Sequence, residues 1–368
     1  MKVLVTGADG FIAKNLLVHL AEREDVEILT FARHDDLDTL ASQVSAADFI
    51  FHLAGVNRPL DNDEFESGNC GLTKIICDLL TAAGSLAPVV FSSSTQATLD
   101  NPYGSSKRRA EAILLQAGEK AGFPVYIFRL PNVFGKWARP EYNSAIATFC
   151  HNIARGIPVR IDDPSAAITA VYVDDVVAAF LDVLDRRPPP AGGSDVEPKY
   201  SITVGDLAAQ LQAFADSRAS LVTEPVGVGL VRALYATYVS YLPPKDFSYL
   251  TPRHADSRGV FVEMLKTRDS GQFSFFTAGP GVTRGGHYHH SKTEKFLVLR
   301  GEARFRFRHL LTGECIELAT SDAESRIVET IPGWTHDVTN IGVADMIVML
   351  WANEIFDRSA PDTYAQAV

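Results

Sequence analysis

The sequence contains few cysteines, no long apolar run and no excess of basic residues. Its four cysteines are scattered and form no C-x-x-C pair, which favours reduced thiols in a cytosol over a disulfide framework. No uncharged apolar stretch approaches the roughly 20 residues that a membrane-spanning helix needs. The formal net charge of −11 disfavours nucleic acid as a general partner, because binding to phosphates requires a basic surface.

The first residues of the chain also lack the apolar segment of a secretory signal. Lys2 to Gly7 pass directly from a strand pattern into a turn, so we expect a cytoplasmic protein without a membrane partner. The length of 368 residues, with 46% hydrophobic and 21% charged residues, indicates an ordinary globular protein of two domains.

The N-terminal part alternates short apolar strands with amphipathic helices, which predicts a doubly wound parallel sheet of the Rossmann type. The expected strands are residues 3–6, 27–31, 49–53, 89–92 and 125–129, and the expected helices are 15–21, 73–83 and 106–121. Further helices at 144–155, 173–185 and 203–215 predict a smaller substrate lobe. We expect this domain to span residues 1–245, with the boundary near the two prolines at 243 and 244.

From about residue 261 the apolar pattern changes to a period of two. Arg304, Arg306 and Arg308 alternate with Phe305 and Phe307, which places one face of a strand in solvent and the other in a core. Similar segments occur at 272–276, 294–299 and 346–350. Many short strands with glycine and proline turns predict an all-β sandwich or barrel over residues 246–368.

A glycine-rich turn follows the first expected strand and opens a helix. Gly7 permits a tight turn, Gly10 lets backbone N–H groups approach a pyrophosphate, and Ala13 replaces the third glycine of the usual fingerprint. The context of strand, turn and helix makes this glycine pattern a specific indication of a dinucleotide site.

The end of the second expected strand bears on the choice of nicotinamide cofactor. An acidic residue there favours NAD, whereas an arginine can pair with the 2′-phosphate of NADP. The sequence Phe31-Ala32-Arg33-His34-Asp35 presents the arginine first, which predicts NADPH. The alternative is that Arg33 is simply solvated and that Asp35 or Asp36 holds a ribose hydroxyl.

Tyr103 and Lys107 are four residues apart at a helix start and therefore share one helix face. An ammonium beside a phenol favours the phenolate, so we expect the pKa of Tyr103 to lie below its usual value. The tyrosine could then exchange a proton with a carbonyl oxygen while a nicotinamide transfers hydride. A serine from the run Ser92-Ser93-Ser94 would orient the same oxygen.

These motifs, with His52-Leu-Ala-Gly55 and Arg129-Leu-Pro-Asn-Val-Phe-Gly135, resemble the extended short-chain dehydrogenase/reductase family over about residues 1–240. The resemblance implies Ser94, Tyr103 and Lys107 as the catalytic set and a nucleotide sugar as the substrate; Ser94 is preferred to Ser93 as the third serine of the run. The cofactor-binding residues expected from it are Gly7, Asp9, Gly10, Phe11, Ile12, Arg33, His34, Leu53, Ala54, Gly55 and Lys107. The substrate-binding residues expected are Asn57, Arg58, Asn132 and Asn143, of which Asn143 is a weaker candidate. Arg129 is a weaker candidate too, and it could instead merely close a strand.

The β-rich half carries two histidine motifs. Gly281-x5-His287-x-His289-x4-Glu294-x6-Gly301 and the later Gly333-x2-His336-x3-Asn340 resemble the two metal-binding motifs of the cupin family. His287 and His289 are two apart on a strand and face one side. Three nitrogens and one carboxylate suit a divalent metal, Zn2+ first and Fe2+, Ni2+ or Mn2+ as alternatives. His290 is an alternative ligand or, together with Tyr288, an acid/base candidate.

Four protein ligands would close a tetrahedral zinc site, and closed sites are usually structural. The metal could instead expand its coordination, or Glu294 could leave it. The sequence leaves both possibilities open.

A short-chain reductase followed by a cupin, in this order and length, resembles a family of bifunctional enzymes of bacterial capsular polysaccharide synthesis. That resemblance implies C3 epimerisation of a UDP-4-keto-6-deoxy-N-acetylhexosamine in the cupin, followed by NADPH-dependent C4 reduction to UDP-N-acetyl-6-deoxy-talosamine. It also implies a homodimer.

Three alternatives stay open at this point. In the first, the reductase alone is catalytic and the cupin serves folding or dimerisation. In the second, the protein only senses NADP, which the Tyr103/Lys107 pair disfavours. In the third, the first site is a dehydratase or epimerase that recycles its nicotinamide. Dehydratases need an acidic pair where this chain has Thr95-Gln96, which favours simple reduction.

Overall fold

The computed structural model describes residues 1–58, 61, 63–190, 195–251, 253–256, 259–262, 265–267, 271–354 and 359–368. The chain divides into two compact units and passes from one to the other after residues 144, 167 and 201. The first unit consists of Met1–Ser144 and Ile168–Ser201, and the second of Ala145–Ala167 and Ile202–Val368.

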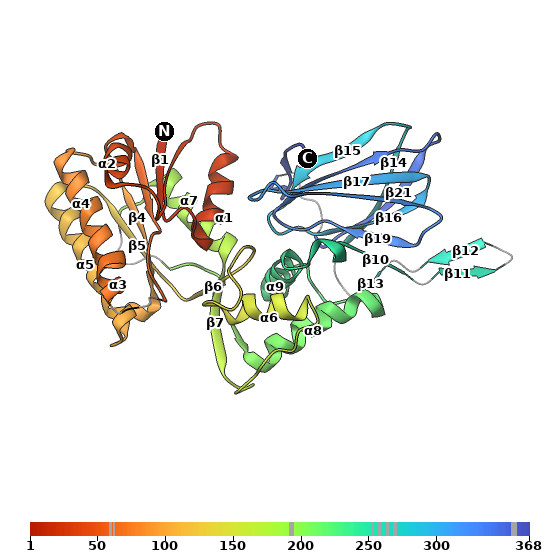
Figure 1. Ribbon diagram of the computed structural model, residues 1–368, viewed down its shortest axis with the longest axis horizontal. Helices are drawn as coiled ribbons and strands as arrows, with labels where there is room; N and C mark the ends of the chain where they lie inside the picture. Colours follow the sequence, from red (N-terminus) through yellow and green to blue (C-terminus); the bar gives the residue numbers. More distant parts are fainter. Residues whose placement is uncertain are drawn as a thin grey trace. The chain divides into compact units, whose positions relative to one another are not determined.

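A five-stranded parallel sheet with the order β2-β1-β3-β4-β5 forms the centre of the first unit (Figure 1). Its strands are β1 (Lys2–Thr6), β2 (Glu27–Phe31), β3 (Phe49–His52), β4 (Val89–Ser94) and β5 (Val125–Leu130). The predicted Rossmann-like sheet is therefore confirmed. The strand order reverses between β1 and β3, and ligands of such sheets bind where the carboxyl ends flank this point.

Helices cover both faces of this sheet. Val3 and Val5 point toward α1 (Phe11–Ala21) and α7 (Val173–Arg186), whereas Leu4 points toward the opposite layer. That layer consists of α2 (Leu37–Ala46), α4 (Leu72–Ala82) and α5 (Pro102–Ala121). Helix α2 was not among the predicted helices; its first turn is capped by Asp36, which accepts a 2.7 Å hydrogen bond from the Thr39 N–H.

Shorter elements complete this part of the chain. They are α3 (Asp63–Phe65), the π-helix η1 (Glu66–Gly71), the 3-10 helix η2 (Thr95–Thr98), and the small sheet of β6 (Asn132–Phe134), β7 (Ala167–Tyr172) and β8 (Tyr200–Thr203).

Two five-stranded antiparallel sheets dominate the second unit, with the orders β10-β19-β16-β21-β14 and β18-β17-β20-β15-β22. The rings of Phe296 and Phe305, one from each sheet, lie 5.5 Å apart in the core between them. This arrangement confirms the predicted all-β sandwich or barrel at that level of detail. The strands are β10 (Ser248–Leu250), β14 (Gln272–Ala278), β15 (Thr283–Tyr288), β16 (Glu294–Arg300), β17 (Glu302–His309), β18 (Cys315–Ser321), β19 (Arg326–Glu329), β20 (Trp334–Asn340), β21 (Met346–Ala352) and β22 (Tyr364–Ala365).

The second unit also contains helices α6 (Ala145–Ile153), α8 (Val204–Ser220) and α9 (Gly229–Ser240), and the short helix η3 (Pro244–Asp246). Two pairs of short strands complete it: β9 (Val222–Thr223) with β13 (Lys266–Thr267), and β11 (Arg253–Asp256) with β12 (Gly259–Val262). In the described part of the chain, no helix is both long and apolar enough to cross a membrane.

The grouping of these helices with the β-sheets differs from the predicted division at residues 245/246. A buried carboxylate explains it, because Glu329 on β19 binds both Arg218 of α8 and Lys295 of β16. Tyr235 of α9 lies at the same carboxylate, 3.5 Å from Oε1. Helices that share a buried ion network with a sheet pack as one body with it. The division at 245/246 stays a prediction about the two functional modules.

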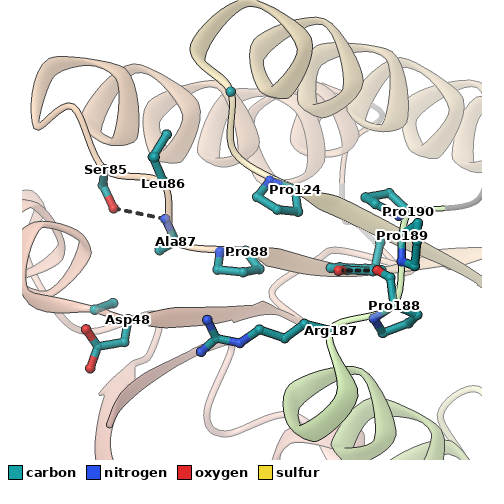
Figure 2. Close-up of a pocket in the computed structure, with 13 residues that line it drawn as sticks. Asp48, Ser85, Leu86, Ala87, Pro88, Pro124, Arg187, Pro188, Pro189 and Pro190 are labelled. Atoms are coloured by element: carbon teal, nitrogen blue, oxygen red, sulfur yellow. Dashed lines mark hydrogen bonds between the residues drawn. The ribbon is translucent and has the colours of Figure 1, made fainter.

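A pocket of about 600 Å³ opens at the amino ends of the central strands of the first unit. Figure 2 shows Pro88 and Pro124, which precede β4 and β5, facing Arg187 and Pro188 across it. The hydroxyl of Tyr126 donates to the Pro188 carbonyl oxygen over 2.7 Å. This pocket lies at the opposite sheet edge from the glycine-rich turn, and none of the predicted site residues lines it.

The turn after β1 requires glycine on two grounds. Gly7 has a φ of +70°, and a Cβ added to it would lie 2.6 Å from the Cα of Ala54 in the loop after β3. Gly84, after α4, has a similar φ of +60° but no atom within 4 Å of an added Cβ. The two glycines therefore separate the cost of the backbone conformation from that of the close approach.

We expect Gly84→Ala to lower the free energy of unfolding by about 1 kcal/mol, the cost of a left-handed residue with a side chain. Gly7→Ala should lower it by about 3 kcal/mol, because the backbone of Ala54 must also move. Urea denaturation of both variants measures the difference. Equal losses would show that the approach of Gly7 to Ala54 is looser than described.

Candidate active site and metal centre

The glycine-rich turn places backbone N–H groups at the carboxyl edge of the parallel sheet. Gly10 is the N-cap of α1, and its own N–H donates to the Gly7 carbonyl oxygen over 2.8 Å. The first turn of α1, which includes the predicted Phe11 and Ile12, contains no acidic side chain. An anion is favoured at such a helix start, because the positive end of the helix dipole is not opposed there.

The segment after β2 distinguishes the two interpretations of its charged residues. The Asp35 carboxylate accepts the Ala32 N–H over 2.7 Å and the Asp36 carboxylate accepts that of Thr39 over 2.7 Å. Each carboxylate therefore stabilises the backbone turn in which it lies. Arg33 is exposed, and its side chain has no hydrogen bond or ion pair within the described residues. His34 lies 3.7 Å from the Asp9 carboxylate, which brings two predicted cofactor residues together.

A buried imidazole fixes the loop that carries Leu53, Ala54 and Gly55. His52 bonds Thr6 of β1 through Nδ1 and Thr73 of α4 through Nε2, each over 2.8 Å. Burial lowers the pKa of His52 to about 3, with a smaller contribution from the Lys107 ammonium, so the ring is neutral at physiological pH. The loop that follows is close to Lys107, since a Cβ on Gly55 would lie 3.0 Å from its Nζ.

The structure brings Ser94, Tyr103 and Lys107 to one place beyond the end of β4. Asn101 caps α5 by accepting the Gly104 N–H over 2.7 Å, and this fixes the first turn, from which Tyr103 projects. A hydrogen bond with Ser94 favours the phenolate of Tyr103. One turn later, the Lys107 ammonium donates to the Ser92 carbonyl oxygen over 2.9 Å.

The expected lowering of the pKa of Tyr103 is not found, and its pKa is raised. Burial raises it, and the hydrogen bond with Ser94 only partly opposes this. Lys107 is itself buried, which lowers its pKa to about 8 against the opposing effect of Glu111. The phenol is therefore kept protonated, the form that a proton donor to a carbonyl oxygen needs.

Ser93 and Arg129 both bind Glu111, although the sequence allowed Ser93 as the catalytic serine and Arg129 as a substrate-binding residue. The Ser93 hydroxyl donates to the buried Glu111 carboxylate over 2.5 Å, and Arg129 pairs with the same carboxylate over 2.6 Å. Both are engaged in bracing β4 and β5 against α5. Glu111, which the sequence analysis missed, is one helical turn beyond Lys107, a spacing that could have signalled it.

The four predicted substrate-binding residues are all exposed, and the structure brings only some of them close together. The guanidinium of Arg58 lies 5.8 Å from the centre of the Tyr142 ring, which precedes Asn143 in the chain. The Arg139 guanidinium lies 5.2 Å from the same ring. Asn132 is directed elsewhere, because its amide donates to the Thr169 carbonyl oxygen over 2.9 Å. For Asn57 the structure gives exposure alone.

In the second unit, the two histidine motifs meet between the β-sheets. One ligand atom from each of His287, His289, Glu294 and His336 lies within 4.8 Å of the others. The Glu294 carboxylate is 3.2 Å from Nε2 of His289 and 3.5 Å from Nε2 of His336. We call these four residues the His/Glu cluster. Adjacent strands place it, since His287 on β15 is paired with His336 on β20.

The pKa shifts of His287, Glu294 and His336 suit a metal site. Burial lowers the pKa of His287 to about 3 and lowers that of His336 as well. Burial would raise the pKa of Glu294, but His289 and His336 hold it well below its usual range. Neutral imidazoles and a carboxylate are the metal-binding forms. Nδ1 of the buried His336 lacks a hydrogen-bond partner among the described residues, and its Nε2 has only the distant Glu294 carboxylate at 3.5 Å, which is unusual unless a ligand supplies one.

His290 and Tyr288 lie outside this cluster. The His290 ring contacts those of Tyr288 and Tyr364, with centroid distances of 5.6 and 4.8 Å. Lys292 was not predicted from the sequence, and its buried ammonium lies 3.6 Å from the Glu294 carboxylate. Asp362 was not predicted either, and its carboxylate accepts the N–H groups of the loop between His289 and Glu294. Only the fold brings Asp362 there, some seventy positions along the chain.

Comparisons with known proteins match both halves of the chain. Residues 3–194 match the NAD dependent epimerase/dehydratase family, and residues 254–364 match the polysaccharide biosynthesis C-terminal domain. A curated protein of Pseudomonas aeruginosa, UDP-2-acetamido-2,6-beta-L-arabino-hexul-4-ose reductase, is 60% identical over 368 residues, which are 100% of this chain and 99% of that protein.

Solved structures agree with these matches. The crystal structure of the capsular polysaccharide assembling protein CapF from Staphylococcus aureus has a TM-score of 0.69 and 41% identity, with 100% of both chains covered. A UDP-glucuronic acid 4-epimerase from Bacillus cereus, at 18% identity and a TM-score of 0.56, covers 66% of this chain and 99% of its own, and shows the fold alone. The chain therefore belongs to the NAD-dependent epimerase/dehydratase family and, within it, to the CapF family.

Proposed function

We propose that the protein is a bifunctional enzyme of UDP-sugar metabolism in surface polysaccharide synthesis. It inverts C3 of a UDP-4-keto-6-deoxy-N-acetylhexosamine and then reduces C4 with NADPH, giving UDP-N-acetyl-6-deoxy-talosamine on the route to N-acetyl-L-fucosamine. The observation that carries the proposal is the 60% identity, over the whole chain, with a reductase whose name specifies a 4-keto sugar. The homodimer and the cytoplasmic location stay predictions.

The first unit supplies the groups for reduction of a ketone. Ser94 and Tyr103 would bind the C4 oxygen, and Tyr103, protonated in its buried setting, would donate the proton. NADPH would supply the hydride. The Lys107 ammonium, held by the Ser92 carbonyl oxygen at 2.9 Å, places a positive charge near the oxygen on which negative charge develops.

Arg33 supports the preference for NADPH. Its guanidinium is exposed beyond β2, where the adenosine ribose of a Rossmann-type site lies. Asp35 and Asp36 each use one carboxylate oxygen to accept a backbone N–H of their own turn. The arginine could bind the 2′-phosphate, which NADH lacks.

The second unit, proposed to be a cupin barrel, would carry the epimerisation. A ketone at C4 makes the C3 proton acidic, so a base can remove it and an acid can return it to the opposite face. The His/Glu cluster would hold a divalent metal, Zn2+ first, because three imidazole nitrogens and one carboxylate suit it. That metal would act as a Lewis acid. His290 stays the proposed acid/base, and the buried Lys292 is a second candidate beside Glu294.

The alternative is a simple 4-ketoreductase whose β-domain is structural. One observation favours it: all four residues of the His/Glu cluster converge within 4.8 Å. Four protein ligands would close a tetrahedral zinc site. In that case the metal stabilises the domain and takes no part in proton transfer.

Isotope exchange separates the two activities. In D2O, the wild type should incorporate deuterium at C3 of the 4-keto sugar before NADPH is added, and should oxidise NADPH afterwards. Tyr103→Phe should retain the exchange but lower the rate of NADPH oxidation about 10²- to 10⁴-fold, the usual contribution of a general acid. NMR follows the exchange at C3, and the absorbance of reduced nicotinamide follows the oxidation of NADPH.

Tyr126→Phe is the matched control, since its hydroxyl binds Pro188 at the opposite edge of the sheet. It should oxidise NADPH at the wild-type rate. Full oxidation by Tyr103→Phe would refute the assignment of the proton donor. Oxidation of NADPH by the wild type without any exchange at C3 would support the alternative, a simple 4-ketoreductase.

Removal of one cluster residue tests the β-domain. His336→Ala should abolish C3 exchange while a substrate already inverted at C3 is still reduced. His309→Ala, a histidine on β17 outside the His/Glu cluster, should keep both steps. Normal exchange in His336→Ala, measured by the same NMR assay, would assign the β-domain a structural task.

Arg33→Ala should raise the KM for NADPH about 10- to 100-fold and leave that for NADH nearly unchanged, because a charge-assisted hydrogen bond contributes about 1.5–3 kcal/mol. Arg186→Ala is the control for loss of one positive charge, since this exposed residue pairs with Asp182 on α7. Steady-state kinetics with both cofactors give the ratio. A ratio equal to that of the wild type would rule out the role of Arg33.

A further inference from the structure

The last residues of the described chain form a strap across the His/Glu cluster. We define the C-terminal strap as residues 361–366. Its strand β22 pairs with β15, so that Ala365 lies opposite His287 and Tyr364 opposite Tyr288. The Gln366 N–H donates to the Gly286 carbonyl oxygen over 2.8 Å. The strap is therefore in register with the strand that carries the first histidine of the cluster.

One side chain of the strap organises the whole loop from His290 to Lys292. The Asp362 Oδ1 accepts the His290 N–H over 2.8 Å. Its Oδ2 accepts the N–H groups of Ser291 and Lys292 over 2.8 and 2.7 Å, and the Ser291 hydroxyl over 3.1 Å. A carboxylate bound by several converging N–H groups is held firmly, and in turn it fixes the backbone that supplies them.

The backbone of the same residue contacts a cluster member directly. The carbonyl oxygen of Asp362 lies 2.5 Å from Nδ1 of His289. A carbonyl oxygen only accepts, so Nδ1 carries the proton, and Nε2 is the nitrogen that faces the Glu294 carboxylate at 3.2 Å. Outer partners of this kind set the tautomer and the ring orientation of a metal-binding histidine.

We propose that Asp362 is a positioning residue of the metal centre. Its side chain fixes the loop after His289, and this places its own carbonyl oxygen where it orients the His289 ring toward the metal. The inference rests on the proposed metal site of the His/Glu cluster. It goes beyond that site, because it makes a remote part of the chain a requirement for metal affinity.

Asp362→Asn tests the role with little change of shape. Both oxygens of the carboxylate accept backbone N–H groups, so the amide N–H2 of asparagine must face at least one of these donors. We therefore expect the loop from His290 to Lys292 to be held less firmly. We expect the affinity for Zn2+ to fall about 10- to 100-fold, the usual effect of losing an outer partner of a metal ligand. Competition with a chromophoric chelator measures the affinity, and thermal unfolding with and without Zn2+ gives an independent readout.

Asp322→Asn is the matched control. Its carboxylate also accepts a backbone N–H, that of Gly301 over 3.1 Å, but this residue belongs to an exposed turn. It should bind Zn2+ like the wild type. A purely structural role of Asp362 would lower the melting temperature of the metal-free protein and leave Zn2+ affinity unchanged, which would overturn the inference while the metal site stands. A wild type that binds no Zn2+ would overturn both.

Hydrogen exchange keeps the test independent of the folding of the variant. In the wild type, Zn2+ should slow amide exchange in the peptide that contains His290, Ser291 and Lys292, and in the strap peptide, together. Slower exchange at the cluster strands with an unchanged strap would contradict the inference.

Discussion

Removal of the Lys107 ammonium from water is the constraint on which the first site depends. A buried cation needs fixed partners, and Lys107 finds the Ser92 carbonyl oxygen at 2.9 Å, with Glu111 close enough to favour its charge. These partners set the distance between α5 and β4, and hence the place where Tyr103 meets Ser94. In the second unit a buried anion follows the same rule, because the Glu294 carboxylate is held by the imidazoles of His289, in the loop after β15, and His336 of β20.

Two neighbouring charged residues of β16 face opposite sides of the sheet and have different partners. Glu294 faces the histidines, whereas Lys295 faces the opposite way and binds Glu329, which also binds Arg218 of α8. Successive residues of a strand point to opposite faces, so one strand joins the His/Glu cluster to the ion network beneath the helices. Removal of one partner from such a buried network is costly, since it leaves a charge without compensation.

Local patterns predicted the parallel sheet and the all-β character of the second half, because turns and alternation are properties of neighbouring residues. The His/Glu cluster and the set of Ser94, Tyr103 and Lys107 were expected from motifs that resemble those of known families, and the fold brings the members of each set together. Local patterns failed where the contacts of a residue come from distant parts of the sequence. The protonated state of Tyr103 depends on burial, which no spacing reports. The engagement of Arg129 with Glu111, the position of His290 beside Tyr364 and the contact of Asp362 with His289 each require the folded chain. Helix α2 was missed because its apolar positions are few.

The three passages of the chain between units set the order in which the nascent protein can fold. Helix α6 buries Ile146, Phe149 and Cys150, and its packing partners are α8 and α9. Both helices are synthesised only after β7 and α7, which belong to the other unit. The apolar face of α6 therefore has no packing partners until α8 and α9 have been synthesised. It also follows that no single cut in the gene separates the two units with their cores intact, so an exchange of modules between relatives has to carry both segments.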